Sequence, residues 1–236
     1  MKVYDLGKRK WIDKYYPGNY GAPGRPRNKK RKKTPEDIAR VNQRNKEKKV
    51  QLLILANFKE GDWHLILTYK KEERPPDMDQ AKKDISEFMD SMRRECKKLG
   101  IPFKWIRVTE VGKRGGCHHH LVIENFPGVV KLVQKYWTHG RTHFTPLYED
   151  GEFEDLAEYL VKKETKEEWT GCSYSRSRNL VIPEPTKEVV HRKRWKKEPQ
   201  PPKGWRLVPN TLVNGINPVT EYPYQHYMIE QLCDSG

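Results

Sequence analysis

The sequence lacks any long apolar run. No stretch of its 236 residues approaches the ~18 consecutive apolar residues that a membrane-spanning helix requires. Residues 1–10 also lack the apolar block of a secretory signal peptide. These absences exclude the membrane and secreted classes, and we expect a soluble protein of the cytoplasm.

Cysteine is also scarce. The four cysteines, Cys96, Cys117, Cys172 and Cys233, are far apart and form no CxxC pair. This spacing excludes a disulfide framework in a chain of this length and predicts reduced thiols. No glycine-rich phosphate-binding loop is present either, so a fused helicase is not expected.

Acidic side chains are outnumbered by basic ones. The chain has 47 Lys and Arg against 32 Asp and Glu, a net charge of +15. Residues 1–50 contain 17 basic and 5 acidic side chains, whereas residues 51–236 contain 30 and 27. The excess favours an acidic polymer as partner, with nucleic acid as the first candidate.

The amino-terminal segment has the composition of an unfolded arm. Residues 17–35 are mainly Pro, Gly and basic residues, which cannot bury enough apolar surface to offset the entropy of ordering. We predict a flexible basic arm over residues 1–33 that gives salt-dependent, largely sequence-independent affinity and can be deleted without loss of chemistry. Its DNA-binding residues would be Lys29, Lys30, Arg31, Lys32 and Lys33.

The rest of the chain alternates between helical and extended patterns. The element order β-α-β-β-α-β-α favours an α+β fold with a central antiparallel sheet and helices packed on it. We predict one main domain over residues 34–182 and a β-rich carboxyl-terminal appendage over 183–236. The predicted helices cover residues 34–55, 78–99, 128–137 and 151–168, and the predicted strands 63–69, 103–111, 117–124, 141–147 and 174–182.

The clearest candidate site lies on the strand that begins at Cys117. Side chains alternate along a strand, so His118 and His120 share one face about 7 Å apart. A hairpin that pairs Val111 with Cys117 would place Glu110 opposite His118. Two imidazoles and a carboxylate with open positions suit Mn²⁺ or Mg²⁺. Surface histidines are the alternative interpretation, and Glu124 is a reserve ligand on the same face.

A tyrosine on a later helix is the candidate nucleophile. Tyr159 precedes Lys162 and Lys163 by about one helical turn. A neighbouring ammonium group lowers the pKa of a phenol or binds the phosphate under attack. The alternative role of Tyr159 is packing at the helix edge.

Basic and aromatic residues follow this helix. Arg176 and Arg178 alternate on an extended segment, so both can face phosphates or lie on a solvated edge. The aromatic residues of the tail can stack on bases or pack a small core. These are Trp195, Trp205, Tyr222, Tyr224 and Tyr227.

Several motifs in this order resemble the HUH endonucleases, and among them the replication-associated (Rep) initiators of rolling-circle replication in phages and plasmids. The resemblance covers roughly residues 34–182. The motifs are residues 65–69, His118-x-His120 with apolar residues after it, Tyr159-x-x-Lys162, and residues 56–62 and 174–180. Relatives often have a non-histidine residue where His119 stands here, and the single tyrosine implies a single-tyrosine mechanism.

The resemblance implies a nickase on a sheet with ferredoxin-like elements. His118, His120 and Glu110 would bind the metal, and Tyr159 would form a 5′-phosphotyrosine link to single-stranded origin DNA, with Lys162 beside it. A host helicase and polymerase in the cytoplasm of a bacterial cell would be the partners. Two alternatives stay open: a single-tyrosine transposase, and a non-catalytic basic nucleic-acid-binding protein.

Overall fold

The computed structural model divides the chain into two compact units. The terminal unit comprises residues 1–44 and 182–236, and the central unit residues 45–181, with the boundary inside the first helix. The structure describes residues 1–16, 34–111, 116–147, 154–161, 174–190, 195–217 and 221–232. None of the helices in these ranges is long and apolar enough to cross a membrane.

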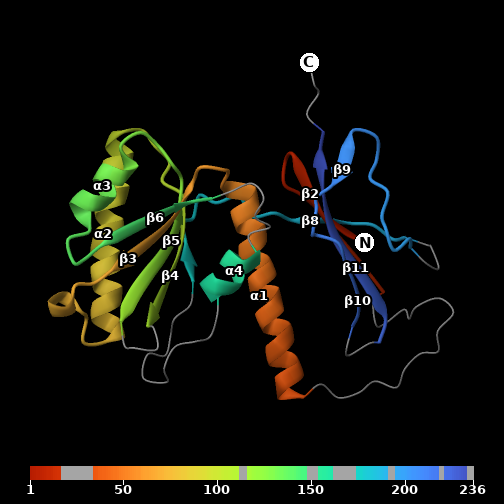
Figure 1. Ribbon diagram of the computed structural model, residues 1–236, viewed down its shortest axis with the longest axis horizontal. Coiled ribbons are helices and arrows are strands. Elements are labelled where there is room, and N and C mark those ends of the chain that lie inside the picture. Colours follow the sequence, from red (N-terminus) through yellow and green to blue (C-terminus); the bar gives the residue numbers. More distant parts are fainter. Residues whose placement is uncertain are drawn as a thin grey trace. The chain divides into compact units, whose positions relative to one another are not determined.

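The central unit contains a five-stranded antiparallel sheet in the order β6-β3-β5-β4-β7 (Figure 1). The predicted α+β class, with helices packed on an antiparallel sheet, is confirmed. The strands are β3 (Trp63–Thr68), β4 (Trp105–Val111), β5 (Cys117–Ile123), β6 (Thr142–Pro146) and β7 (Ser175–Arg176).

Two helices cover one face of this sheet. Helix α2 (Met78–Lys98) and helix α3 (Val129–Tyr136) pack on it through an apolar cluster that includes Leu67, Leu121 and Met89. The carboxylate of Asp77 caps α2 by accepting a hydrogen bond from the Gln80 amide. Gly100, with φ of 68°, ends the helix in the left-handed region. A short 3₁₀ helix, η1 (Lys71–Glu73), precedes α2.

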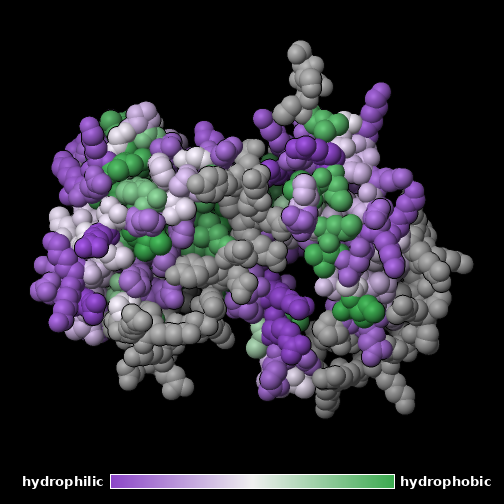
Figure 2. Space-filling view, viewed as in Figure 1, coloured by the Kyte–Doolittle hydropathy of each residue, from purple (hydrophilic) through white to green (hydrophobic). Residues whose placement is uncertain are grey.

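The opposite face is covered by the carboxyl-terminal half of α1 (Pro35–Asn57) and by α4 (Glu154–Val161). Val50, Leu53 and Ile54 of α1 join the buried cluster on this face. The helix begins with a reciprocal cap, since Asp37 N–H donates to Thr34 Oγ1 and Thr34 N–H to Asp37 Oδ2. Figure 2 shows the amino-terminal half of α1 covered with hydrophilic side chains.

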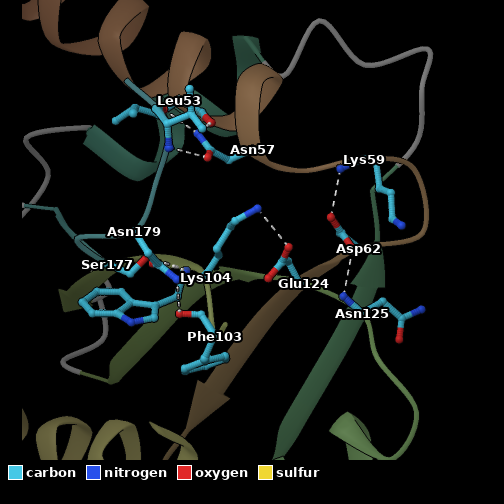
Figure 3. Close-up of polar contacts among 12 residues, drawn as sticks. Leu53, Asn57, Lys59, Asp62, Phe103, Lys104, Glu124, Asn125, Ser177 and Asn179 are labelled. Atoms are coloured by element: carbon cyan, nitrogen blue, oxygen red, sulfur yellow. Dashed lines mark hydrogen bonds and ion pairs between the residues drawn. The ribbon is translucent and has the colours of Figure 1, made fainter. Parts of the chain in front are cut away.

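Two buried polar side chains fix the connections around this sheet (Figure 3). The Asn57 amide donates to the carbonyls of Leu53 and Val181, and its oxygen accepts from Val181 N–H. The Asp62 carboxylate, 1% exposed, accepts from the amides of Lys59 and Asn125. Each side chain thereby satisfies backbone groups that lie outside the helices and strands.

Both ends of the chain form the sheet of the terminal unit. Its strands follow the order β10-β11-β2-β1-β8, and β9 also pairs with β11. They are β1 (Lys2–Asp5), β2 (Arg9–Tyr15), β8 (Pro185–Lys187), β9 (Trp205–Leu207), β10 (Val213–Ile216) and β11 (Pro223–Gln231).

The prediction of a flexible arm is therefore wrong for residues 2–5 and 9–15, which are strands. Strand β2 pairs with β11 along seven residues, and Trp11 and Ile12 are buried. The pairing partner lies more than 200 residues further along the chain, so local composition could not reveal it. The remainder of the predicted arm, residues 17–33 with Lys29, Lys30, Arg31, Lys32 and Lys33, lies outside the described residues.

Candidate functional site

The predicted hairpin register is the one observed. Val111 pairs with Cys117 and Glu110 with His118 on the antiparallel β4 and β5 strands. Ile106 and Val122 pack on the α1 and α4 side of the sheet, and alternation places Glu110, His118 and His120 on the same side. We call this side the histidine face.

His120 lies between a carboxylate and a second imidazole. Its Nε2 is 3.6 Å from Glu110 Oε2, and its Nδ1 is 3.4 Å from His64 Nε2. Burial, followed by the nearby His64 and His118, lowers the pKa of His120 to about 3. The ring is therefore neutral at physiological pH, which is the state that a metal requires of an imidazole.

His118 has a buried nitrogen without a partner. Its Nδ1 makes no hydrogen bond among the described residues, and its ring centroid is 6.4 Å from that of His120. An unsatisfied buried nitrogen beside a neutral imidazole and a carboxylate fits the donor set of a divalent cation. In the part of the chain that the structure describes, however, no three His, Cys, Asp or Glu side chains form a group that could hold a metal ion. His118 stands apart from the close pair of Glu110 and His120.

Sequence reasoning assigned no role to His64 and His143, although both lie near this site. His64 stands on β3 opposite Val122, and its ring is 5.6 Å from that of His120. Burial, and then His143, lowers the pKa of His64 to about 4. The alternating pattern of residues 63–69 could have indicated the face of His64, but only the sheet order shows that β3 neighbours β5.

His119 belongs to the core on the other face. Its Nε2 is 2.8 Å from the Tyr69 hydroxyl and its Nδ1 is 2.8 Å from the Thr109 hydroxyl. Its ring also packs against Trp137. With both nitrogens engaged and no exposed surface, His119 has a packing role, one of the alternatives that its position left open.

The candidate nucleophile comes from a helix on the histidine face. Ala157, Leu160 and Val161 of α4 pack in the same buried cluster as Val108 of β4. This packing brings the backbone of Tyr159 over the face that carries Glu110, His118 and His120. The side chain of Tyr159 lies outside the described residues, as do Lys162 and Lys163.

Three further candidates take different positions. Glu124, the reserve ligand, forms an ion pair with Lys104 at 3.2 Å (Figure 3). Arg176 pairs opposite Ile106, which places it on the histidine face. Arg178 is exposed in a turn after β7 and does not continue the strand alternation with Arg176. Their predicted phosphate contacts therefore have different geometric support.

Comparison with known proteins connects this site to DNA replication. Residues 62–168 match a family model of replication-associated proteins, the ORF2 type. This segment includes the β4–β5 hairpin and α4, and the similarity supports a Rep-like, replication-associated protein. No curated protein and no solved structure matches the chain.

Proposed function

We propose that the protein nicks and rejoins single-stranded DNA at a replication origin and so initiates rolling-circle replication. The observation that carries this proposal is the close approach of Glu110 and His120 on the histidine face, beside His118 and under helix α4. The replication-associated family match over the same segment supports DNA as the substrate.

Glu110, His118 and His120 would hold a divalent cation, Mn²⁺ or Mg²⁺. The neutral state of His120 and the unpaired Nδ1 of His118 leave lone pairs for such a cation. When bound, the cation would supply Lewis-acid polarisation of the scissile phosphodiester. Mn²⁺ or Mg²⁺ suits this mixed set of nitrogen and oxygen ligands with open positions better than a closed structural zinc site.

Tyr159 would act as the nucleophile. Its phenolic oxygen attacks the phosphorus, the bond from phosphorus to the 3′ oxygen breaks, and the strand keeps its 5′ phosphate on the tyrosine. The phenolic proton passes to solvent, and the departing 3′ oxygen takes up a proton to become a hydroxyl that can prime synthesis. Lys162 or Lys163, one turn after Tyr159, would stabilise the phenolate or the phosphate oxygens. Attack by a 3′ hydroxyl on the phosphotyrosine reverses these steps and rejoins a strand.

A covalent-adduct assay tests this proposal. The full chain is incubated with Mn²⁺ and labelled single-stranded oligonucleotides of randomised sequence, and adducts are separated by denaturing electrophoresis. We expect an adduct with the wild type, none with Tyr159→Phe, and a large loss with His120→Ala. His139→Ala is the matched control, since His139 pairs with Glu73 and contacts the ring of Tyr69.

The same assay separates the alternatives. An adduct that persists in Tyr159→Phe would refute the nucleophile, and its insensitivity to chelation would refute the metal site. If the wild type binds DNA but never forms an adduct or a nick, the protein is a non-catalytic nucleic-acid-binding protein. Strand transfer that requires transposon-end sequences, without nicking at an origin, would identify a single-tyrosine transposase.

A further inference from the structure

A buried glutamine in the terminal unit gathers lysines at one place on the sheet. Gln225 of β11 has no exposed surface, and its amide nitrogen lies 2.9 Å from the Lys196 carbonyl and 3.1 Å from the Lys197 carbonyl. The Gln225 oxygen accepts a hydrogen bond from Lys14 Nζ at 3.2 Å, directly across the strand pair. One amide therefore holds a loop with two lysines beside a third lysine on β2.

An aromatic pair lies beside these lysines. The rings of Tyr16 and Trp195 stack with centroids 4.7 Å apart and planes 18° apart. Tyr222, 4% exposed, meets the ring of Tyr16 edge-on and supports it. Tyr16 and Trp195 themselves keep part of their surface in solvent. Stacked rings at a surface present a flat face to which an unpaired base can add.

The charge of this region is not neutralised locally. Lys196 and Lys197 are exposed, and among the described residues neither forms an ion pair with a carboxylate. The Lys196 ammonium donates to the neutral amide of Gln200. The terminal unit as a whole contains 22 basic and 10 acidic side chains, against 25 and 22 in the central unit. Clustered cations of this kind attract a polyanion.

We propose that the surface formed by Lys14, Tyr16, Trp195, Lys196 and Lys197, which we call the lysine–tryptophan surface, binds single-stranded DNA. The lysines contact phosphates, and a base stacks on the ring pair of Tyr16 and Trp195. Single-stranded DNA fits better than duplex because only unstacked bases can reach the aromatic rings. The choice of DNA as the nucleic acid rests on the proposed function. Gln225 is a positioning residue, since it holds the loop and touches no DNA.

Binding without cleavage tests the surface. The full chain is titrated, in EDTA and over a range of salt concentrations, into a fluorescein-labelled oligothymidylate, with fluorescence anisotropy as the readout. The double variant Lys196→Ala/Lys197→Ala should bind more weakly and lower the slope of log affinity against log salt by about 0.7 per lysine. Trp195→Leu should weaken binding roughly 5- to 150-fold, and Trp195→Phe should restore part of the loss.

The matched control is Lys8→Ala/Lys203→Ala, which removes two exposed lysines of the same unit away from the aromatic pair. Circular dichroism and thermal unfolding verify that each variant folds. Gln225→Ala should reduce affinity, as the lysine variants do, because it releases the loop that carries Lys196 and Lys197. A control that loses as much affinity as Lys196→Ala/Lys197→Ala would overturn the surface.

Two further outcomes complete the test. Equal losses on oligothymidylate and on its duplex with oligoadenylate would overturn the assignment to single strands. The absence of divalent cations makes the result independent of cleavage. If the wild type never nicks DNA but the variants lose affinity as described, the surface stands and the proposed function fails. If the variants bind like wild type while it nicks DNA, the reverse holds.

Discussion

At the scale of residues, three consecutive histidines take two different environments because side chains alternate along β5. His119 enters the core and has both nitrogens in hydrogen bonds, whereas His118 and His120 lie on the opposite face. The strand period thus separates a structural imidazole from two candidate ligands. Substitutions on each face should consequently affect different properties, namely stability on one and metal affinity on the other.

Removing one hydroxyl from the core should test the structural role of His119. Tyr69→Phe leaves a buried His119 nitrogen unpaired, so we expect the free energy of unfolding to fall by about 1–3 kcal/mol in denaturant titration. Tyr15→Phe is the control, because Tyr15 is 40% exposed and should change stability by less than about 0.5 kcal/mol. Equal effects of the two substitutions would contradict the buried hydrogen bond.

A second prediction concerns His64, whose Nε2 faces His120 Nδ1. If His120 binds a cation through Nε2, a partner on Nδ1 fixes the orientation of the ring, and losing such a partner typically weakens metal binding 10- to 100-fold. We therefore expect His64→Phe to lower Mn²⁺ affinity by about that factor in isothermal titration calorimetry. His139→Gln should leave the affinity unchanged, and an unchanged affinity in His64→Phe would remove this role for His64.

At the scale of elements, the end of α1 is held by a side chain rather than by a backbone cap. Asn57 is 9% exposed and satisfies both the N–H and the carbonyl of Val181, the last residue of the central unit. This contact fastens the exit of the chain to the end of the helix. It also keeps β7 close to β4, because β7 and Val181 belong to one short segment.

Cutting the Asn57 side chain should therefore loosen the segment after β7. Asn57→Ala leaves two backbone groups of Val181 unpaired, and we expect a loss of about 2–4 kcal/mol in the unfolding free energy of the central unit. Hydrogen exchange should show faster exchange at the Val181 amide. Asn45→Ala, an exposed position on the same helix, serves as the control and should slightly favour the helix. Unchanged exchange at Val181 would show that the contact does not restrain the segment.

At the scale of the whole molecule, the two ends of the chain build one sheet, and the central unit is inserted between them in the sequence. Strand β2 lies between β1 and β11, so removing it would separate the strands on either side of it in the sheet. The charge distribution suggested that residues 1–33 could be deleted without structural cost. The sheet shows that such a deletion would remove two strands.

Two truncation experiments separate charge from structure. Deletion of residues 1–16 should abolish the cooperative unfolding of the terminal unit in calorimetry and make residues 182–232 sensitive to protease. Replacement of Lys29, Lys30, Arg31, Lys32 and Lys33 by Gln should preserve that transition and lower the salt dependence of DNA binding by up to about 0.7 per lost phosphate contact. A terminal unit that unfolds normally after the deletion would contradict the central place of β2.

Local patterns were enough to predict the elements of the central unit and the face of the candidate ligands. Helical stripes, the cap at Thr34, the stop at Gly100 and strand alternation are local signals, so they predicted α1, α2 and the Glu110–His118 register. The tertiary fold was needed to show that His64 meets His120, that α4 covers the histidine face, and that β2 pairs with β11. These contacts join segments far apart in the chain, and no local periodicity encodes which distant strands become neighbours.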